Sequence, residues 1–186
     1  MIPQPVFDKF KSMKSILTII LIALVAASVS GQSEIIGRTI PSVNIKTIEG
    51  MQFNTSDISN DGKPILLTFW AIWCKSCINE LNAIAEVYDQ WQEETGMKIV
   101  AISIDDSRTQ PKVAPMVSGN GWEYEVYSDP NGDFKRAMGV NLIPHLFIID
   151  GNMKVVYQHT SYAEGNESEL YEIIRQVAEG KPVEHE

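Results

Sequence analysis

The stretch Phe69-Trp70-Ala71-Ile72-Trp73-Cys74-Lys75-Ser76-Cys77 decides the fold of this 186-residue chain, and it holds the chain's only two cysteines. An apolar, strand-like run enters it from Ile65, and an amphipathic helical pattern leaves it toward Glu94. Residues three apart on a first helical turn are neighbours, so the sulfurs of Cys74 and Cys77 can close a disulfide. The stretch therefore predicts a strand that turns into a helix, with a cysteine pair at the helix start.

The predicted helix start favours thiol chemistry at Cys74. Unpaired backbone N–H groups and the positive end of the helix dipole lie there, and both stabilise a thiolate. The pKa of the Cys74 thiol is therefore expected below the free value of about 8.5, and the positive charge of Lys75 acts in the same direction. Cys77, one turn further into the helix, is the expected resolving thiol that attacks a mixed disulfide.

Two other interpretations of the cysteine pair are open. A purely structural disulfide is disfavoured, because a bridge between residues i and i+3 closes a very short loop and constrains the unfolded chain little. A structural zinc site needs about four ligands. Besides the two cysteines the sequence offers only His145, His159 and His185, so we expect no metal site and no cofactor.

The N-terminal segment has the pattern of an export signal. Lys9, Lys11 and Lys14 precede an apolar run over residues 16–29, and small residues follow at positions 28–31. The run is shorter than the roughly 20 residues of a membrane-spanning helix, so cleavage is favoured over retention as an anchor. We expect a signal peptide at residues 1–30, with Met13 as an alternative start, and one domain at residues 31–186.

The charge of the chain excludes some classes of partner. Residues 1–30 hold three lysines and one aspartate, so their removal changes the formal net charge from −9 to −11. A protein with this excess of carboxylates binds nucleic acid and anionic membranes poorly. The expected partners are therefore other proteins, and membrane contact is expected only through an uncleaved N-terminal segment.

The other segments predict an α/β domain. Short alternating runs around a Glu49-Gly50 turn predict a β-hairpin within residues 40–58. A strand, a helix and a second buried strand on this length scale imply a right-handed βαβ unit with a parallel strand pair. The elements expected after the cysteine pair are a helix to residue 95, a strand at 98–104, a helix at 110–119, a strand at 125–127, a helix at 134–138, a strand at 154–159 and a helix at 167–179.

A strand that ends in Trp-Cys-x-x-Cys at the start of a helix resembles the active-site signature of thioredoxin-like proteins. The leading hairpin, the extra segment between the two halves and the Ile-Pro-His-Leu-Phe-Ile-Ile-Asp-Gly stretch from Ile143 extend the likeness. Over residues 36–179 the chain resembles the exported TlpA/ResA-like thiol-disulfide oxidoreductases. The resemblance implies a thioredoxin fold, a central mixed β-sheet flanked by helices, with an N-terminal β-hairpin and an insert between the βαβ and ββα halves.

The resemblance also implies how the site is built around a redox-active Cys74–Cys77 disulfide. Pro144 would be in the cis form and lie against the disulfide, and the backbone of Ile143 would pair with an incoming peptide as an added strand. An ordinary trans proline at the first position of a strand is the alternative. The remaining supporting residues are the aromatic Trp70 and Trp73 and the two residues between the cysteines, Lys75 and Ser76.

Proton transfer at the site is less clear from the sequence. In many thioredoxins a buried aspartate on the strand before the motif relays protons, and the matching residue here is Thr68, which cannot ionise. Glu80, three residues after Cys77, matches an acid of the cytochrome-maturation branch of the family and is a candidate general base; a solvated glutamate is the alternative. His145 is expected near the sulfurs, where a protonated imidazole would favour the thiolate, or where it simply packs.

The function implied by the resemblance is the reduction of disulfides in other proteins of a bacterial periplasm or cell envelope, with electrons from an unidentified membrane donor. Some family members act in cytochrome c maturation. An oxidase or isomerase would use the same residues in the opposite direction. A metal chaperone is disfavoured because related copper-delivery proteins use a Cys-x-x-x-Cys spacing, and a peroxiredoxin because a Pro-x-x-x-Thr-x-x-Cys segment is absent.

Overall fold

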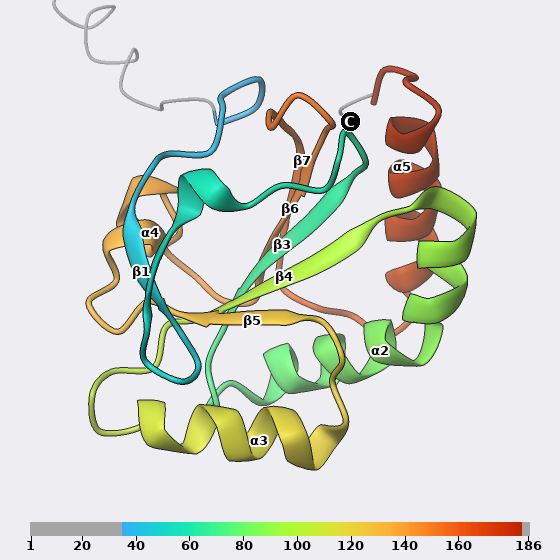
Figure 1. Ribbon diagram of the computed structural model, residues 1–186. Coiled ribbons are helices and arrows are strands. Elements are labelled where there is room, and N and C mark those ends of the chain that lie inside the picture. The colour runs from blue at the N-terminus through green and yellow to red at the C-terminus, as the bar shows by residue number, and fades with distance from the viewer. Residues whose placement is uncertain (1–34, 184–186) are drawn as a thin grey trace, which may run out of the picture. The chain divides into compact units, whose positions relative to one another are not determined.

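A computed structural model of the protein describes residues 35–183, and the predicted signal peptide lies outside them. The described residues build a mixed sheet of seven strands in the order β2-β1-β5-β4-β3-β6-β7, with helices on both faces (Figure 1). This architecture confirms the predicted thioredoxin-like fold class. Its elements are β1 (Asn44–Thr47), β2 (Gln52–Asn54), η1 (Thr55–Asp57), β3 (Ile65–Trp70), α2 (Lys75–Thr95), β4 (Lys98–Ser103), η2 (Gln110–Lys112), α3 (Val113–Asn120), β5 (Glu125–Ser128), α4 (Asp133–Ala137), β6 (His145–Ile149), β7 (Val155–Thr160) and α5 (Glu167–Ala178).

Strand β3 lies in the middle of the sheet and leads directly to the cysteine pair. It pairs in parallel with β4 and antiparallel with β6, and all six of its residues are buried. A strand covered on both faces reads as a continuous apolar run rather than as an alternating one, which is the pattern of Ile65–Trp70. The predicted βαβ unit with its parallel strand pair is therefore confirmed.

The predicted leading hairpin is present and becomes one edge of the sheet. β1 and β2 pair antiparallel, with Ile45 opposite Phe53, and β1 also pairs antiparallel with β5. The rings of Phe53 and Tyr127 stack with their centroids 4.2 Å apart. The insert strand β5 thus connects the hairpin to the central strands.

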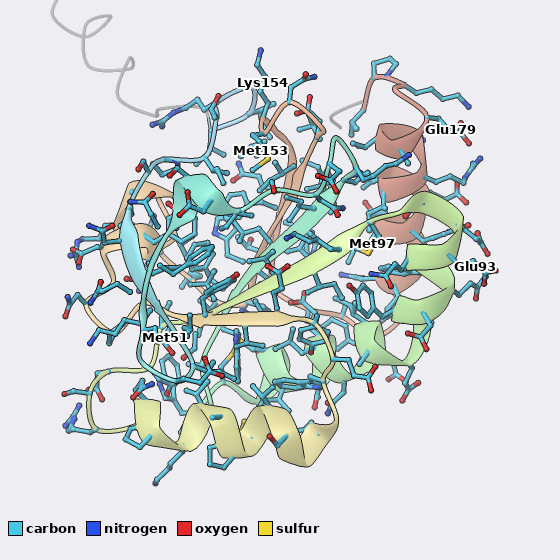
Figure 2. All side chains as sticks on the ribbon, viewed as in Figure 1. Met51, Glu93, Met97, Met153, Lys154 and Glu179 are labelled. Carbon is cyan, nitrogen blue, oxygen red and sulfur yellow. A yellow bond between two sulfur atoms is a disulfide. The ribbon has the colours of Figure 1, made fainter. Side chains whose placement is uncertain are left out.

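The two faces of the sheet carry separate apolar cores. Alternate residues of a strand point to opposite faces, so Leu66 and Trp70 face one core and Leu67 and Phe69 face the other. The first core is completed by α2, α3 and α5 and contains both cysteines, whereas the second is completed by α4 and by residues from the N-terminal part of the described chain. In Figure 2 Met97 lies among the core side chains, while Glu93 and Glu179 project outward from their helices.

Helix α2 begins at the cysteine pair and ends at Thr95, as the sequence predicts. Gly96 adopts a left-handed conformation with φ of 69°, and its N–H donates to the carbonyl of Gln92, which closes the last turn. The helix begins at Lys75, directly after Cys74, so the predicted nucleophile is the N-cap residue.

Two predicted elements are displaced for identifiable reasons. The helix predicted at residues 110–119 starts as the 3₁₀ turn η2, and α3 follows from Val113. Pro115 has no N–H to donate to the carbonyl of Pro111, so an α-helix cannot run through both residues from Gln110. The strand predicted at 154–159 begins one residue later, because Asp150 Oδ1 accepts the N–H groups of Asn152 and Lys154 and holds them in the turn.

Within residues 35–183 no helix is both long and apolar enough to cross a membrane.

Candidate active site

The two cysteines form a disulfide at the N-terminus of α2. Their Sγ atoms are 2.03 Å apart and their Cα atoms 5.3 Å apart, within the range that a disulfide spans. Cys74 has extended backbone angles, and its Sγ accepts a hydrogen bond from the N–H of Cys77 at 3.3 Å. A sulfur therefore takes the place of the oxygen that usually caps a helix, and it faces the donors that stabilise a thiolate.

The two sulfurs differ in access. Cys74 is 7% exposed, whereas Cys77 is completely buried in the core beneath α2. The residues between them, Lys75 and Ser76, are exposed, and the Oγ of Ser76 lies 3.5 Å from the Sγ of Cys74. Because a thiolate must reach a disulfide sulfur in line, only Cys74 is placed to meet another protein.

The segment predicted to lie beside the disulfide adopts the geometry that the resemblance implies. The Ile143–Pro144 peptide bond is cis, and Pro144 is buried at the point where β6 begins. Ile143 packs against the same core cluster that contains Cys74 and Cys77. Leu142, just before it, is 70% exposed, and Trp73, the residue before Cys74, is 64% exposed, so both present apolar surface to solvent.

The other tryptophan of the motif lies inside the protein. Trp70 is fully buried and meets the ring of Trp122 edge to face, with the centroids 5.1 Å apart. Trp122 in turn donates from its Nε1 to the side chain of Asn82 on α2 at 2.9 Å. Trp70 thus supports the first turns of α2 from below, while Trp73 forms the exposed rim.

Glu80 is buried one helical turn beyond Cys77. Its side chain is only 2% exposed, so the alternative of a solvated glutamate is wrong. Burial raises the pKa of Glu80 from its usual value of 4.5 to about 7, a hydrogen bond from Thr68 opposes this rise, and the charge of Glu167 adds to it. A carboxyl group with a pKa near neutrality can both take up and return a proton, which is what a general base for Cys77 requires.

Thr68 and Glu80 are brought together by the fold. Thr68 is buried on β3, and its Oγ1 donates to Glu80 Oε2 at 3.4 Å. The sequence compares Thr68 with a relay aspartate and Glu80 with a separate acid, but it does not predict that the two touch. The strand therefore supplies a hydrogen-bond donor, and the helix supplies the ionisable group.

We expect Thr68→Val to raise the pKa of Glu80 further. Valine keeps the shape of threonine but removes the donor that stabilises the carboxylate, so the neutral form gains. The pKa is measured from the ¹³C shift of the Glu80 carboxyl carbon during a pH titration. The control is Thr160→Val at an exposed position of β7, and a Glu80 pKa equal to or below the wild-type value in Thr68→Val would refute the contact.

His145 does not lie where the sequence suggests. Its ring stacks on Phe147 with the centroids 4.3 Å apart, and its Nε2 lies 3.3 Å from Gln158 Oε1. Phe147 belongs to the core on the face of the sheet opposite the cysteines. Residues two apart on a strand point to the same side of the sheet, so the ring of His145 lies on that face as well. Burial lowers the pKa of His145, although the bond to Gln158 opposes this. Of the two roles expected for His145, these contacts support packing.

Asp105 is a polar residue of this region that the sequence analysis missed. It lies two residues beyond the end of β4, is completely buried, and its Oδ2 accepts the N–H of Ile72 at 2.9 Å. In the sequence it is one of two consecutive aspartates after a strand, which is typical of an exposed loop. Nothing in the pattern separates it from Asp106, which is only half-buried and pairs with Arg108.

An open groove of about 750 Å³ begins beside the cysteine pair. It runs from Ser76 along α2 and is closed on its other side by the segment that leads from β7 into α5. The carboxylates of Glu86, Glu164 and Glu167 line it, and the lining contains no lysine or arginine. The groove can therefore take a polar or basic stretch of polypeptide next to the disulfide.

Comparison with known proteins agrees with this geometry. The model of the AhpC/TSA family matches residues 36–158. The thiol-disulfide oxidoreductase ResA of Bacillus anthracis is 32% identical over 123 residues, which are 66% of this chain and 68% of the relative. The thiol:disulfide interchange protein DsbE of Escherichia coli (strain K12) is 29% identical over 129 residues, 69% of this chain and 66% of the relative.

A solved structure gives the same result. The solution structure of an uncharacterized thioredoxin-like protein from Porphyromonas gingivalis is 51% identical, covers 78% of this chain and 95% of its own, and superposes with a TM-score of 0.69. The family match, the named relatives and the cysteine pair at disulfide distance point the same way. The chain therefore belongs to the AhpC/TSA family and is a thioredoxin-like thiol-disulfide oxidoreductase similar to ResA and DsbE.

Proposed function

We propose that this protein reduces disulfide bonds in other proteins through a Cys74–Cys77 dithiol cycle. The Cys74 thiolate attacks one sulfur of the substrate disulfide, which forms a mixed disulfide and expels the first substrate sulfur as a thiolate. The Cys77 thiol loses its proton to Glu80 and attacks Cys74 Sγ, so the second substrate sulfur leaves and the enzyme disulfide closes. Two electrons pass to the substrate, and a donor of two electrons must restore the thiols.

The observation that carries this proposal is the asymmetry of the cysteine pair. Cys74 is the N-cap of α2 on the accessible side, and Cys77 is buried one turn from a carboxyl group whose pKa is about 7. An attacking sulfur needs access and a stabilised thiolate, whereas a resolving sulfur needs protection and a proton acceptor. Each cysteine has the surroundings of one of these two roles.

The direction that we propose is supported by how few interactions the site offers to a thiolate. A strongly oxidising disulfide requires a reduced state in which the thiolate is held by many favourable interactions. Here the Sγ of Cys74 accepts one backbone N–H bond, that of Cys77, at 3.3 Å. The buried carboxylate of Glu80 adds negative charge one helical turn from Cys77 and opposes a thiolate there. Both features favour the disulfide form of the enzyme and hence a reductant.

The surface around Cys74 supports a protein as substrate. Among residues 35–183 the N–H and C=O of Ile143 have no backbone partner, so they are available to an extended segment that adds as a strand. Exposed Trp73 and Leu142 offer apolar contact, and the groove that begins at Ser76 gives room for the chain beyond the substrate cysteine. A small disulfide would use none of these features.

We further propose that the protein works outside the cytoplasm, in the periplasm or cell envelope of a bacterium. The charged and apolar pattern of residues 1–30 supports export, and the electron donor would then be a membrane protein. Glu80 matches the acid of the cytochrome-maturation branch, which supports an apocytochrome c with a Cys-x-x-Cys-His segment as the substrate. Oxidase or isomerase activity would use the same residues, and tight stoichiometric Cu(I) binding by the reduced protein would instead indicate a metal chaperone.

The proposed direction is tested by running the exchange both ways at pH 7. The reduced protein is mixed with insulin, the oxidised protein with a reduced, unfolded protein, and the thiols of each are counted over time. We expect the reduced protein to transfer its electrons to insulin much faster than the oxidised protein forms disulfides in the second substrate. The opposite order would identify an oxidase.

A further inference from the structure

We propose that Asp105 is a positioning residue for thiol–disulfide exchange, because its buried carboxylate holds the loop that presents Cys74. The loop of residues 71–73 joins β3 to α2, and Ile72 stands two residues before the nucleophile. The Asp105 Oδ2 atom accepts the Ile72 N–H at 2.9 Å. The proposed role rests on Cys74 being the attacking sulfur, and it goes beyond the two cysteines, Glu80 and the cis proline.

The contact is built from a rigid element. Asp105 lies just beyond the carboxyl end of β4, and β4 is held in parallel register with β3 up to the pair Trp70 and Ser103. The same Oδ2 atom accepts the hydroxyl of Ser103 at 2.9 Å, and the N–H of Asp105 donates to that hydroxyl oxygen at 3.2 Å. The carboxylate is therefore fixed on the sheet before it binds the loop.

The loop has one other closing bond, from the N–H of Cys74 to the carbonyl of Ala71 at 3.0 Å. That bond shapes the turn but does not tie it to the sheet. The hydrogen bond from the Ile72 N–H to Asp105 ties the loop to the sheet, and it fixes the position of the loop relative to the end of β4. A shift there would move the Sγ of Cys74 away from the Cys77 N–H and from the line of attack.

A role in stability alone does not explain a carboxylate at this point. Asp105 is completely buried, and among the described residues its Oδ1 atom has no hydrogen-bond partner. Two more buried polar atoms in the same part of the sheet, Trp70 Nε1 and Ser128 Oγ, are also without one, and the registers of β3, β4 and β5 place these residues in one row with Ser103. Partly satisfied buried polar groups destabilise a core, so the benefit of Asp105 lies in what its bonded oxygen holds.

The experiment compares Asp105→Ala and Asp105→Asn with the wild type in the full chain. The reduced proteins react with 2-hydroxyethyl disulfide, a small neutral probe, and the second-order rate constant is followed from pH 5 to pH 10. The high-pH plateau reports the reactivity of the Cys74 thiolate, and the midpoint reports the pKa of its thiol. Asp106→Ala is the matched control, because Asp106 is the next residue but its side chain is 45% exposed.

We expect Asp105→Ala to lower the plateau about tenfold or more, since a displacement of about 1 Å can slow a reaction by up to ~10²-fold. Asp105→Asn retains an oxygen that can accept the Ile72 N–H, so its plateau should stay within about threefold of the wild type. Asp106→Ala should leave the plateau unchanged. A residue that acts only on stability would lower the melting temperature of Asp105→Ala without moving the plateau of the folded protein.

Several results would overturn the proposed role. One is a folded Asp105→Ala variant whose high-pH plateau of the rate constant equals that of the wild type. Another is an Asp105→Asn variant whose plateau is as low as that of Asp105→Ala, because the charge and not the hydrogen bond would then be responsible. If Asp105→Ala does not fold, amide hydrogen exchange decides: the Ile72 N–H must be protected in both the wild type and Asp105→Asn, and rapid exchange in the wild type contradicts the contact. A wild-type protein that does not react at all would refute the cysteine cycle itself.

Discussion

Cys74→Ser is expected to abolish the reduction of disulfides by this protein. Of the two sulfurs, that of Cys74 at the N-cap of α2 is the more accessible and is the one placed to attack a substrate, and a serine hydroxyl is far less nucleophilic than a thiolate. The rate of insulin reduction should fall by roughly 10³-fold or more, the scale of loss when a nucleophile is removed. The rate is measured from the precipitation of the reduced insulin or from the release of thiols.

Cys77→Ser is the matched control for this variant. It keeps the attacking sulfur and loses the resolving one, so it should react once and remain linked to its substrate. A stable mixed disulfide is then visible by non-reducing electrophoresis with Cys77→Ser and absent with Cys74→Ser. The opposite pattern, with the adduct formed by Cys74→Ser, would reverse the roles of the two cysteines.

Glu80→Gln is expected to produce the second large effect, on the release of substrate from the mixed disulfide. In the wild type the rate of this step should rise with pH through about 7, because Glu80 must be ionised to accept the Cys77 proton. Glutamine cannot accept the proton, so the rise at about pH 7 should disappear and the rate at pH 8 should fall by roughly 10²-fold. Rapid mixing with a fluorescent disulfide substrate measures the release.

The same substitution should change how stability depends on pH. Because the folded protein keeps the Glu80 proton up to about pH 7 while the unfolded chain loses it near 4.5, the folded state binds more protons between these values. The contribution of Glu80 to stability is therefore fully present below about pH 4.5 and is lost as the pH rises through 7, by on the order of 3 kcal/mol.

Urea unfolding of the oxidised proteins at pH 5 and pH 8 checks this dependence. Glu80→Gln should gain stability relative to the wild type as the pH rises, whereas Glu86→Gln, on the same helix but exposed, should show no such gain. An equal difference between Glu80→Gln and the wild type at both pH values would contradict the raised pKa. Unchanged release kinetics would remove Glu80 from the mechanism even if the pKa is raised.

Much of the fold could be predicted because local patterns determine it. The buried run of β3, the spacing of apolar residues along α2 and the glycine at position 96 each specify an element without help from distant residues. The pairing of the leading hairpin with β5 could not be predicted in the same way. It depends on contacts between strands about 80 residues apart, such as Lys46 with Ser128, and no local pattern encodes that register.

The features of the candidate site also differ in whether a local sequence pattern predicts them. The cysteine pair and the position of Pro144 stand in the sequence as motifs, and the fold brings them to one end of the sheet. The burial of Glu80 depends on how α2 lies over β3, and the two environments of Asp105 and Asp106 depend on β4 and the loop above it. For His145 the useful signal is that successive residues of β6 face opposite sides of the sheet. This pattern places the ring of His145 on the same side as Phe147 and away from the cysteines.

The reduction potential of the Cys74–Cys77 couple tests the central claim most directly. The protein is equilibrated with mixtures of reduced and oxidised dithiothreitol or glutathione at pH 7, and the fraction of disulfide is measured at each ratio. A protein-disulfide reductant should give a value near that of thioredoxin, about −270 mV, or lower. A value near about −120 mV, the range of a strong oxidant, would contradict the proposed direction.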